Sequence, residues 1–252
     1  MLRYLIVLSA LTTGLDFGVE RAAADDTYYM VILATDSAPR RVGGSHTFAT
    51  VVKLSDRLDA DGKRPMESHT ISWMPASMKI KLLRGPEPGV NLSLEQTLSW
   101  AQSQNLRVTA WGPYQIKKEL FDQALAQKER LESGAIAYKA LDSRSRCGAV
   151  SNCIHAVAGL DLQGGMISTG NAYGEPASRM VAEHLQRWII QPGMTYPALN
   201  ESLALAPAGV RFQPLDQAEE VAALPQATAS ASAVNASPPQ TAPAPEASTA
   251  KK

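Results

Sequence analysis

The sequence predicts an α+β domain with a mainly antiparallel sheet and helices packed against it. In the first half of the domain, runs of β-branched and aromatic residues are separated by turn-rich links, as is typical of strands. Further along, apolar residues recur at intervals of three and four, as is typical of amphipathic helices. Because a group of strands precedes most of the helices, antiparallel pairing is favoured over a parallel sheet.

The first strands are expected to form a hairpin with a long loop. Residues 27 to 35 (TYYMVILAT) make a buried strand, and His46–Leu54 follows after a turn-rich link. The Asp-Gly pair at residues 61 and 62 marks a turn, and residues 69 to 74 make the next strand. Pairing about residue 61 would place His46 and His69 at opposite ends of the sheet.

One more strand is expected within residues 79 to 91, and the periodicity then changes. Ser93 and Gln96 have the spacing of a capping box, which predicts a helix over residues 93 to 104. A strand at residues 106 to 111 follows.

The second half of the domain contains the remaining helices. Pro113 is expected to open a long helix that ends at Ser133, because proline is favoured at the first helical position and Gly134 follows as a stop signal. The other expected elements are a strand at residues 135 to 141, a short helix beginning in residues 151 to 157 (SNCIHAV), and a last helix from Pro176.

Both ends of the chain differ from this domain. Residues 1 to 24 are predicted to be a signal peptide, because Arg3 precedes an apolar run too short to anchor in a bilayer and Ala22 to Ala24 offer a cleavage site. Residues 214 to 252 are rich in Ala, Pro, Ser and Thr and are predicted to be a disordered tail. Residues 25 to 213 therefore form one exported domain, periplasmic or secreted, with no integral membrane segment after cleavage.

The charge balance argues against nucleic acid as a partner. The 24 basic and 24 acidic residues give a formal net charge of zero, with no basic stripe. Two cysteines and four histidines do not form a metal-binding pattern, and no phosphate-binding glycine loop is present. We therefore expect no cofactor and no metal.

Cys153 is the strongest candidate for chemistry. With Ser151 as the expected N-cap, Cys153 falls in the first turn of a helix, where backbone N–H groups and the helix dipole favour a thiolate. A thiolate nucleophile also needs an imidazole partner. His155 lies only two residues away and points to a different side of the helix, and His184 lies on an apolar stripe, so His46 and His69 are the better candidates.

The order of these residues resembles the circularly permuted branch of the papain-like superfamily, which includes cell-wall amidases and lipid-directed acyltransferases. The segments SHTFATVVKL and SNCIHAV carry the resemblance, which covers roughly residues 28 to 160. It implies that Cys153 is the nucleophile and His46 the general base, with His69 or Ser72 as the orienting group. The implied function is an exported thiol hydrolase or acyltransferase acting on cell-wall peptides or lipids, with the backbone N–H of Cys153 in the oxyanion hole.

A second interpretation makes Cys153 structural. Cys147 and Cys153 are six positions apart, and an oxidising compartment favours their pairing as a disulfide. The protein would then be a non-catalytic binding or structural module. A reversible disulfide that guards the nucleophile would agree with both interpretations. The aromatic residues Trp73, Trp111 and Tyr114 are expected either to line a substrate cleft or to pack in the core.

Overall fold

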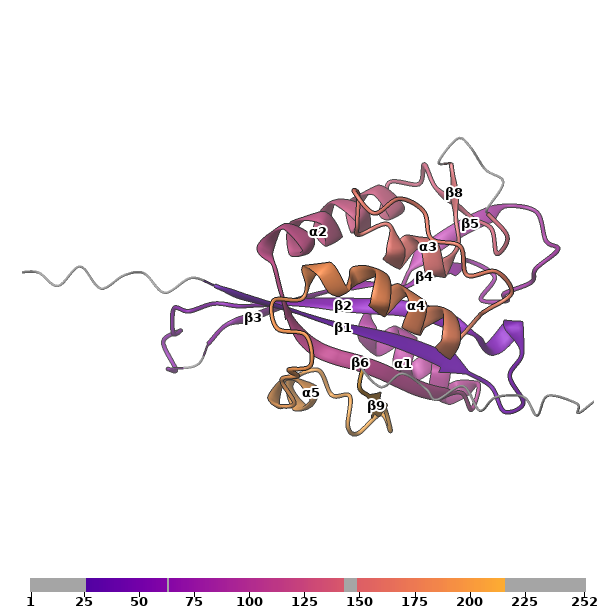
Figure 1. Cartoon of the computed structure of the whole chain (residues 1–252). Coiled ribbons are helices and arrows are strands. Elements are labelled where there is room, and N and C mark those ends of the chain that lie inside the picture. The colour runs from indigo at the N-terminus through magenta and orange to yellow at the C-terminus, as the bar shows by residue number, and fades with distance from the viewer. Residues whose placement is uncertain (1–25, 63, 143–148, 216–252) are drawn as a thin grey trace, which may run out of the picture. The chain divides into compact units, whose positions relative to one another are not determined.

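The computed structural model describes residues 26 to 62, 64 to 142 and 149 to 215 (Figure 1). They form an α+β fold with a five-stranded sheet in the order β3-β2-β1-β6-β9 and a four-stranded sheet in the order β4-β5-β7-β8. Most strand pairs are antiparallel, which confirms the predicted fold class. The predicted signal peptide, Cys147, and all but the first two residues of the predicted tail lie outside the described residues.

The larger sheet is built on three long, mostly buried inner strands, β2, β1 and β6. Its strands are β1 (Thr27–Asp36), β2 (His46–Leu54), β3 (Met66–Ile71), β6 (Arg107–Ile116) and β9 (Arg211–Gln213). Strand β1 pairs antiparallel with β2 and β6, and β9 adds parallel to β6 at one edge. Strands β2 and β3 pair Ala49 with Ile71 and Lys53 with Glu67, so the hairpin turns close to the expected residue 61.

The smaller sheet continues directly from the end of β3. It contains β4 (Trp73–Pro75), β5 (Glu87–Asn91), β7 (Ala137–Tyr138) and β8 (Val150–Ser151). Strands β7 and β8 pair in parallel, with Tyr138 opposite Ser151. This pairing places Tyr138 beside the segment that leads into the cysteine helix.

The helices cover both faces of the larger sheet (Figure 1). They are α1 (Leu94–Ser103), α2 (Lys118–Glu132), α3 (Cys153–Ala158), α4 (Glu175–Leu185) and α5 (Ala198–Ser202), with 3-10 turns at Val42–Gly44 and Gln186–Trp188. Helices α2, α3 and α4 pack on one face, and α1 and α5 pack on the other. The capping box of Ser93 and Gln96 is present at the start of α1, as predicted. No helix of the described residues is long and apolar enough to cross a membrane.

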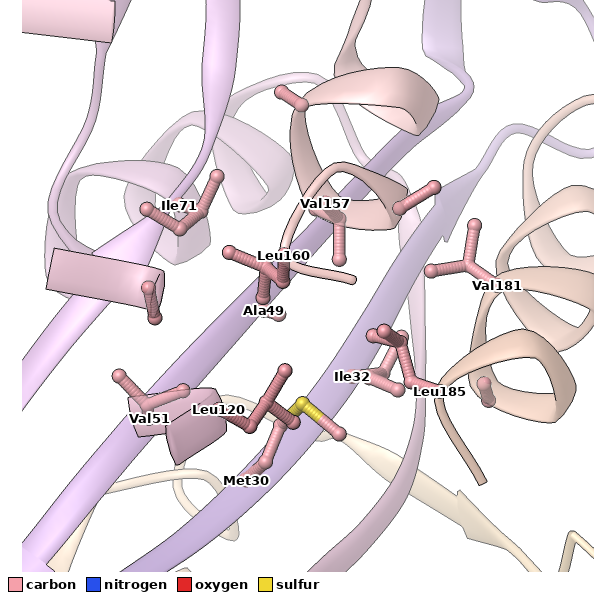
Figure 2. Packing of buried hydrophobic residues seen from close by; sticks show 14 of the residues in the cluster. Met30, Ile32, Ala49, Val51, Ile71, Leu120, Val157, Leu160, Val181 and Leu185 are labelled. Atoms are coloured by element: carbon pink, nitrogen blue, oxygen red, sulfur yellow. The ribbon is translucent and has the colours of Figure 1, made fainter. Parts of the chain in front are cut away.

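Two hydrophobic cores lie on opposite faces of the larger sheet, because successive strand residues point to opposite sides. Figure 2 shows the first core, in which Ile32 of β1 and Ala49 and Val51 of β2 meet Val157, Leu160 and Leu185. The second core contains the neighbouring strand residues, including Val31 and Phe48, and packs against α1 and α5. Side chains on β2 therefore face α3 at odd-numbered positions and α1 at even-numbered positions.

The predicted helix from Pro113 is wrong. Strand β6 continues through Pro113 to Ile116, and α2 begins only at Lys118. The register with β1 shifts at this point, and Gly112 has a φ of 97°, a value that favours glycine. Pairing with β1 and burial of Tyr114 outweigh the local helical signal of the proline.

The three aromatic residues considered for a substrate cleft are in the core. Trp73, Trp111 and Tyr114 are each at most 1% exposed. Burying such large rings stabilises the fold and leaves none of them to contact a ligand.

Candidate functional site: the Cys153 pocket

Cys153 lines a pocket of about 660 Å³, here called the Cys153 pocket. Its walls come from β7, the start of α3, the start of β2, and residues 166 to 174, which run between α3 and α4. The polar lining includes Ser45, Thr47, Tyr138, Asp142, His155 and Asn171. The volume is in the range of small-molecule sites.

Leucine and methionine side chains stand at the mouth of the Cys153 pocket. Leu82, Leu141 and Met166 line it and are 42%, 49% and 68% exposed. Large apolar side chains gathered around one pocket mark a surface for an apolar group rather than a solvated face. The site therefore combines a few polar groups with a largely apolar lining that extends to the rim.

A buried network anchored on Asp142 holds the start of α3. Asn152 is the N-cap: its side-chain oxygen accepts from the backbone N–H of His155 at 2.8 Å. The Asn152 backbone N–H and Nδ2 each donate to Asp142 at 2.8 Å. The expectation that Ser151 is the N-cap is wrong, since its hydroxyl donates to the Asn152 carbonyl instead.

Cys153 is a free thiol in the structure and is 7% exposed. Burial raises its pKa to about 11, although the backbone N–H groups of Thr47 and Ile154 favour the thiolate. Asp142, whose negative charge lies nearby, adds to the rise. At pH 7 a thiol with this pKa is ionised in about one molecule in 10,000, against about one in 30 for an ordinary cysteine. The expectation of a lowered pKa at the helix start is therefore wrong, because desolvation outweighs the helix terminus.

Tyr138 is the immediate polar neighbour of the sulfur. Both side chains line the Cys153 pocket, and Cys153 acts on the pKa of the Tyr138 phenol. Burial, with the nearby Cys153 and Asp142, raises the pKa of Tyr138 above its ordinary value, so the phenol keeps its proton. The thiol thus has a neutral phenol in its surroundings, and the His155 ring nitrogens face Asp142 and Ile167 instead.

The structure does not bring His46 to Cys153. Thr47, which faces α3, lines the Cys153 pocket, whereas the neighbouring His46 points into the second core. There its ring stacks on Phe48, with 5.5 Å between centroids, and meets Trp100 edge-on at 6.0 Å. The prediction that His46 is the general base for Cys153 is contradicted by this geometry, because a sheet separates the two side chains.

His46 does meet the proposed orienting residue Ser72. Its Nε2 lies 2.8 Å from the Ser72 hydroxyl, which the hydroxyl of Thr97 also approaches at 2.8 Å. Burial lowers the pKa of His46 to about 3, so the ring is neutral. Its Nδ1 is buried and finds no hydrogen-bond partner among the described residues. This pair is a buried structural network with no route to the Cys153 pocket.

His69 also lies away from Cys153. Its Nε2 is 2.7 Å from Glu67 Oε1, and its ring meets Phe121 at 5.9 Å between centroids. It lines a second, separate groove beside β3. The described residues therefore give no support for His69 as an orienting group.

The imidazole of the Cys153 pocket is His155, which was set aside in the sequence. Its Nδ1 is 2.6 Å from Asp142 Oδ1, and its Nε2 is 2.9 Å from the Ile167 carbonyl. Both partners are acceptors, so the doubly protonated ring satisfies them best. Burial acts to lower its pKa, but the hydrogen bond and charge of Asp142 outweigh it, and the pKa is raised. The sequence contains no motif that predicts this contact, because Asp142 lies in a loop after a strand and His155 is the third residue of α3.

We expect His155 to stabilise the fold more at low pH. Its raised pKa means that the stabilisation is fully present below about pH 6.5 and is lost as the pH rises through the folded-state pKa. Urea unfolding of the wild type and of His155→Gln should differ by about 1 kcal/mol more at pH 5.5 than at pH 9. A difference that stays constant over this range, or grows at high pH, would contradict the cationic pairing.

The segment that covers the Cys153 pocket is tied at several points. His155 holds it at Ile167, and Asp161 accepts from the backbone N–H of Gly164 at 2.9 Å near its start. At its end, Asp36 accepts from the backbone N–H of Glu175 at 2.9 Å. Gly174 has a φ of 64°, and a Cβ there would lie 2.0 Å from Asp36, so this position requires glycine. The pocket is therefore a defined part of the fold.

Among the described residues, no group of three or more His, Cys, Asp or Glu side chains is arranged to hold a metal ion. No protein-family model, curated protein or solved structure matches this chain.

Proposed function

We propose that this protein is an exported binding module that takes an acyl chain with a polar head in the Cys153 pocket. The observation that carries the proposal is the apolar rim of Leu82, Leu141 and Met166 on a largely apolar pocket that also offers a few hydroxyl and amide groups. An acyl chain would bury part of that rim, and burial of apolar surface is worth about 25 cal/mol per Å². The polar head would lie against groups such as Ser45, Thr47 and Asn171.

The state of the thiol supports binding over catalysis. Cys153 is protonated at neutral pH, its pKa being about 11, and the phenol of Tyr138 in the same pocket is neutral. In His155, the imidazole of this pocket, both ring nitrogens are already hydrogen-bonded, Nδ1 with Asp142 and Nε2 with the Ile167 carbonyl. No described group is thus placed to remove the proton of the thiol.

A thiol hydrolase or acyltransferase is the second candidate, as the papain-like resemblance implies. It is favoured by the place of Cys153 at the start of α3, where the backbone N–H groups of Thr47 and Ile154 approach the sulfur. In such a reaction the sulfur bonds to an acyl carbon, the leaving group departs with the thiol proton, and water or another acceptor then takes the acyl group. The same N–H groups would polarise the carbonyl oxygen.

One alkylation experiment separates the two candidates. The rate of iodoacetamide labelling of Cys153 is measured by peptide mapping from pH 6 to pH 11, with and without dodecanoate, in the presence of reductant so that Cys147 is free. We expect slow labelling at neutral pH, with an apparent pKa well above that of an ordinary thiol. Dodecanoate should slow the labelling further by covering the sulfur.

Leu82 and Leu83 provide a matched pair of variants. Leu82 lines the Cys153 pocket, whereas Leu83 is 96% exposed and is not part of its lining. Leu82→Asp should abolish the protection by dodecanoate, and Leu83→Asp should keep it. Equal protection in the two variants would overturn the acyl-chain proposal. Fast labelling at a pH below the ordinary thiol pKa would instead favour the hydrolase. If this fast labelling disappeared in His155→Gln, His155 would be identified as the imidazole that activates the thiol.

A further inference from the structure

A second groove of about 770 Å³ follows the free edge of β3 and is independent of the Cys153 pocket. Strand β3 is the outer strand of the larger sheet, and its residues Met66, Ser68 and Thr70 line the groove. One wall comes from α1 and from residues 202 to 208, and the other comes from α2. An edge strand exposes unpaired backbone groups that can template another strand.

The pairing of β2 with β3 shows which backbone groups face the groove. The backbone N–H of Ser55 donates to the Pro65 carbonyl at 3.0 Å, and hydrogen-bonded pairs alternate along an antiparallel ladder. Glu67, His69 and Ile71 therefore direct their N–H and C=O groups to β2. Met66, Ser68 and Thr70 direct theirs outward, into the groove.

Asn91 confirms this direction and closes one end of the outward row. Its Nδ2 donates to the Thr70 carbonyl at 2.9 Å, and its Oδ1 accepts from the Ser72 backbone N–H at 2.7 Å. No described residue hydrogen-bonds the outward backbone groups of Met66 and Ser68. The side-chain amide of Asn91 thus bonds the backbone of β3 as a neighbouring strand would, and an added strand would continue this pairing along Ser68 and Met66.

We propose that this groove binds an extended peptide as an additional strand on β3. Side chains of an added strand alternate between the two faces of the sheet. One set would meet the apolar wall of Leu94, Leu98 and Leu203, and the other would meet Lys128 and Glu132. The groove lies between α1 and α2, and its acidic lining favours a basic peptide over a second copy of this chain, whose formal net charge is zero.

The charges of the groove favour a basic peptide. Glu95 and Glu132 line it, and the Lys128 ammonium is already engaged, 2.6 Å from Glu132 Oε2. His69 also lines the groove, and its Nε2 lies 2.7 Å from Glu67 Oε1. The carboxylates therefore outnumber the cations, and the occupant is a segment in which apolar residues alternate with lysine or arginine.

Ser68 allows a test of backbone pairing. Ser68→Pro removes an N–H that points into the groove without removing one that bonds β2, and edge strands tolerate proline at such positions. Ser68→Ala keeps the N–H and is the matched control. The probe is a capped hexapeptide in which valine alternates with lysine, titrated into the labelled protein and followed by backbone amide NMR.

We expect the peptide to shift the amide signals of Met66, Ser68 and Thr70. Affinity should fall about tenfold in Ser68→Pro, because the hydrogen bond of the Ser68 N–H is lost, and stay unchanged in Ser68→Ala. A peptide N-methylated at its valines keeps its charge and side chains and should also bind at least about tenfold more weakly.

Several results would overturn the proposal. These are equal affinity of the two Ser68 variants when circular dichroism shows both folded, equal affinity of the N-methylated peptide, or absence of binding at millimolar peptide. Self-association of the chain that disappears in Ser68→Pro would assign the edge to a second copy instead. The N-methylated peptide keeps the test decisive if Ser68→Pro does not fold.

Discussion

Acidification from pH 6.5 to pH 4 is expected to lower the free energy of unfolding by about 3 kcal/mol through His46 alone. His46 has a pKa of about 3 in the folded protein, where burial disfavours the charged ring, and an ordinary pKa of 6.5 when unfolded. Below pH 6.5 the His46 ring binds a proton in the unfolded chain but stays unprotonated in the folded protein. Stability contributed by the neutral ring is thus present above pH 6.5 and is lost as the pH falls.

His46→Gln tests this expectation. Glutamine keeps a polar group near Ser72 but does not titrate, so its unfolding free energy should depend less steeply on pH between 6.5 and 4. The measurement is urea unfolding at half-unit pH steps for both proteins. His155 gives no such acid loss, because its raised pKa acts in the opposite direction. If the two pH profiles are parallel, the buried neutral state of His46 is refuted.

Replacing Asp142 should be the most damaging single change at the Cys153 pocket. Asp142 is 4% exposed and accepts three hydrogen bonds, from the backbone N–H and Nδ2 of Asn152 and from His155 Nδ1. Asp142→Ala leaves these donors buried and unpaired, and we expect a loss of about 3 kcal/mol in unfolding free energy at pH 6.

Asp142→Asn is the matched control for the charge. It keeps the shape and one acceptor oxygen, so its loss should be intermediate. Chemical unfolding followed by tryptophan fluorescence measures both variants. A loss below about 1 kcal/mol for Asp142→Ala would show that the network does not hold the start of α3.

Local sequence patterns were sufficient for much of the fold. The bounds of β2, the approximate place of the hairpin turn and the capping box of α1 all follow from short-range signals, namely burial runs, a turn dipeptide and a side-chain-to-backbone spacing, although the observed register differs by two residues from a turn centred on residue 61. Pro113 shows where such signals fail. The strand it lies in is fixed by partners on β1 that are distant in sequence, and this pairing overrides local propensity.

The candidate site was harder to predict because β2 is buried on both faces. His46 to Val52 are all buried, so hydrophobic alternation could not say which side chains face the cysteine helix. Cys153 was correctly placed in the first turn of α3, but its pKa depends on desolvation, which the sequence does not report. The contact between Asp142 and His155 depends on a loop geometry with no sequence motif.

The one-residue offset between His46 and Thr47 makes this protein a scaffold for enzyme design. Thr47 faces α3, lines the Cys153 pocket and supplies a backbone N–H to the sulfur. Thr47→His would install an imidazole on the face of the sheet that carries the thiol, with the pocket as space for the ring. The substitution would therefore place a titratable nitrogen base beside a thiol that has none positioned to take its proton among the described residues.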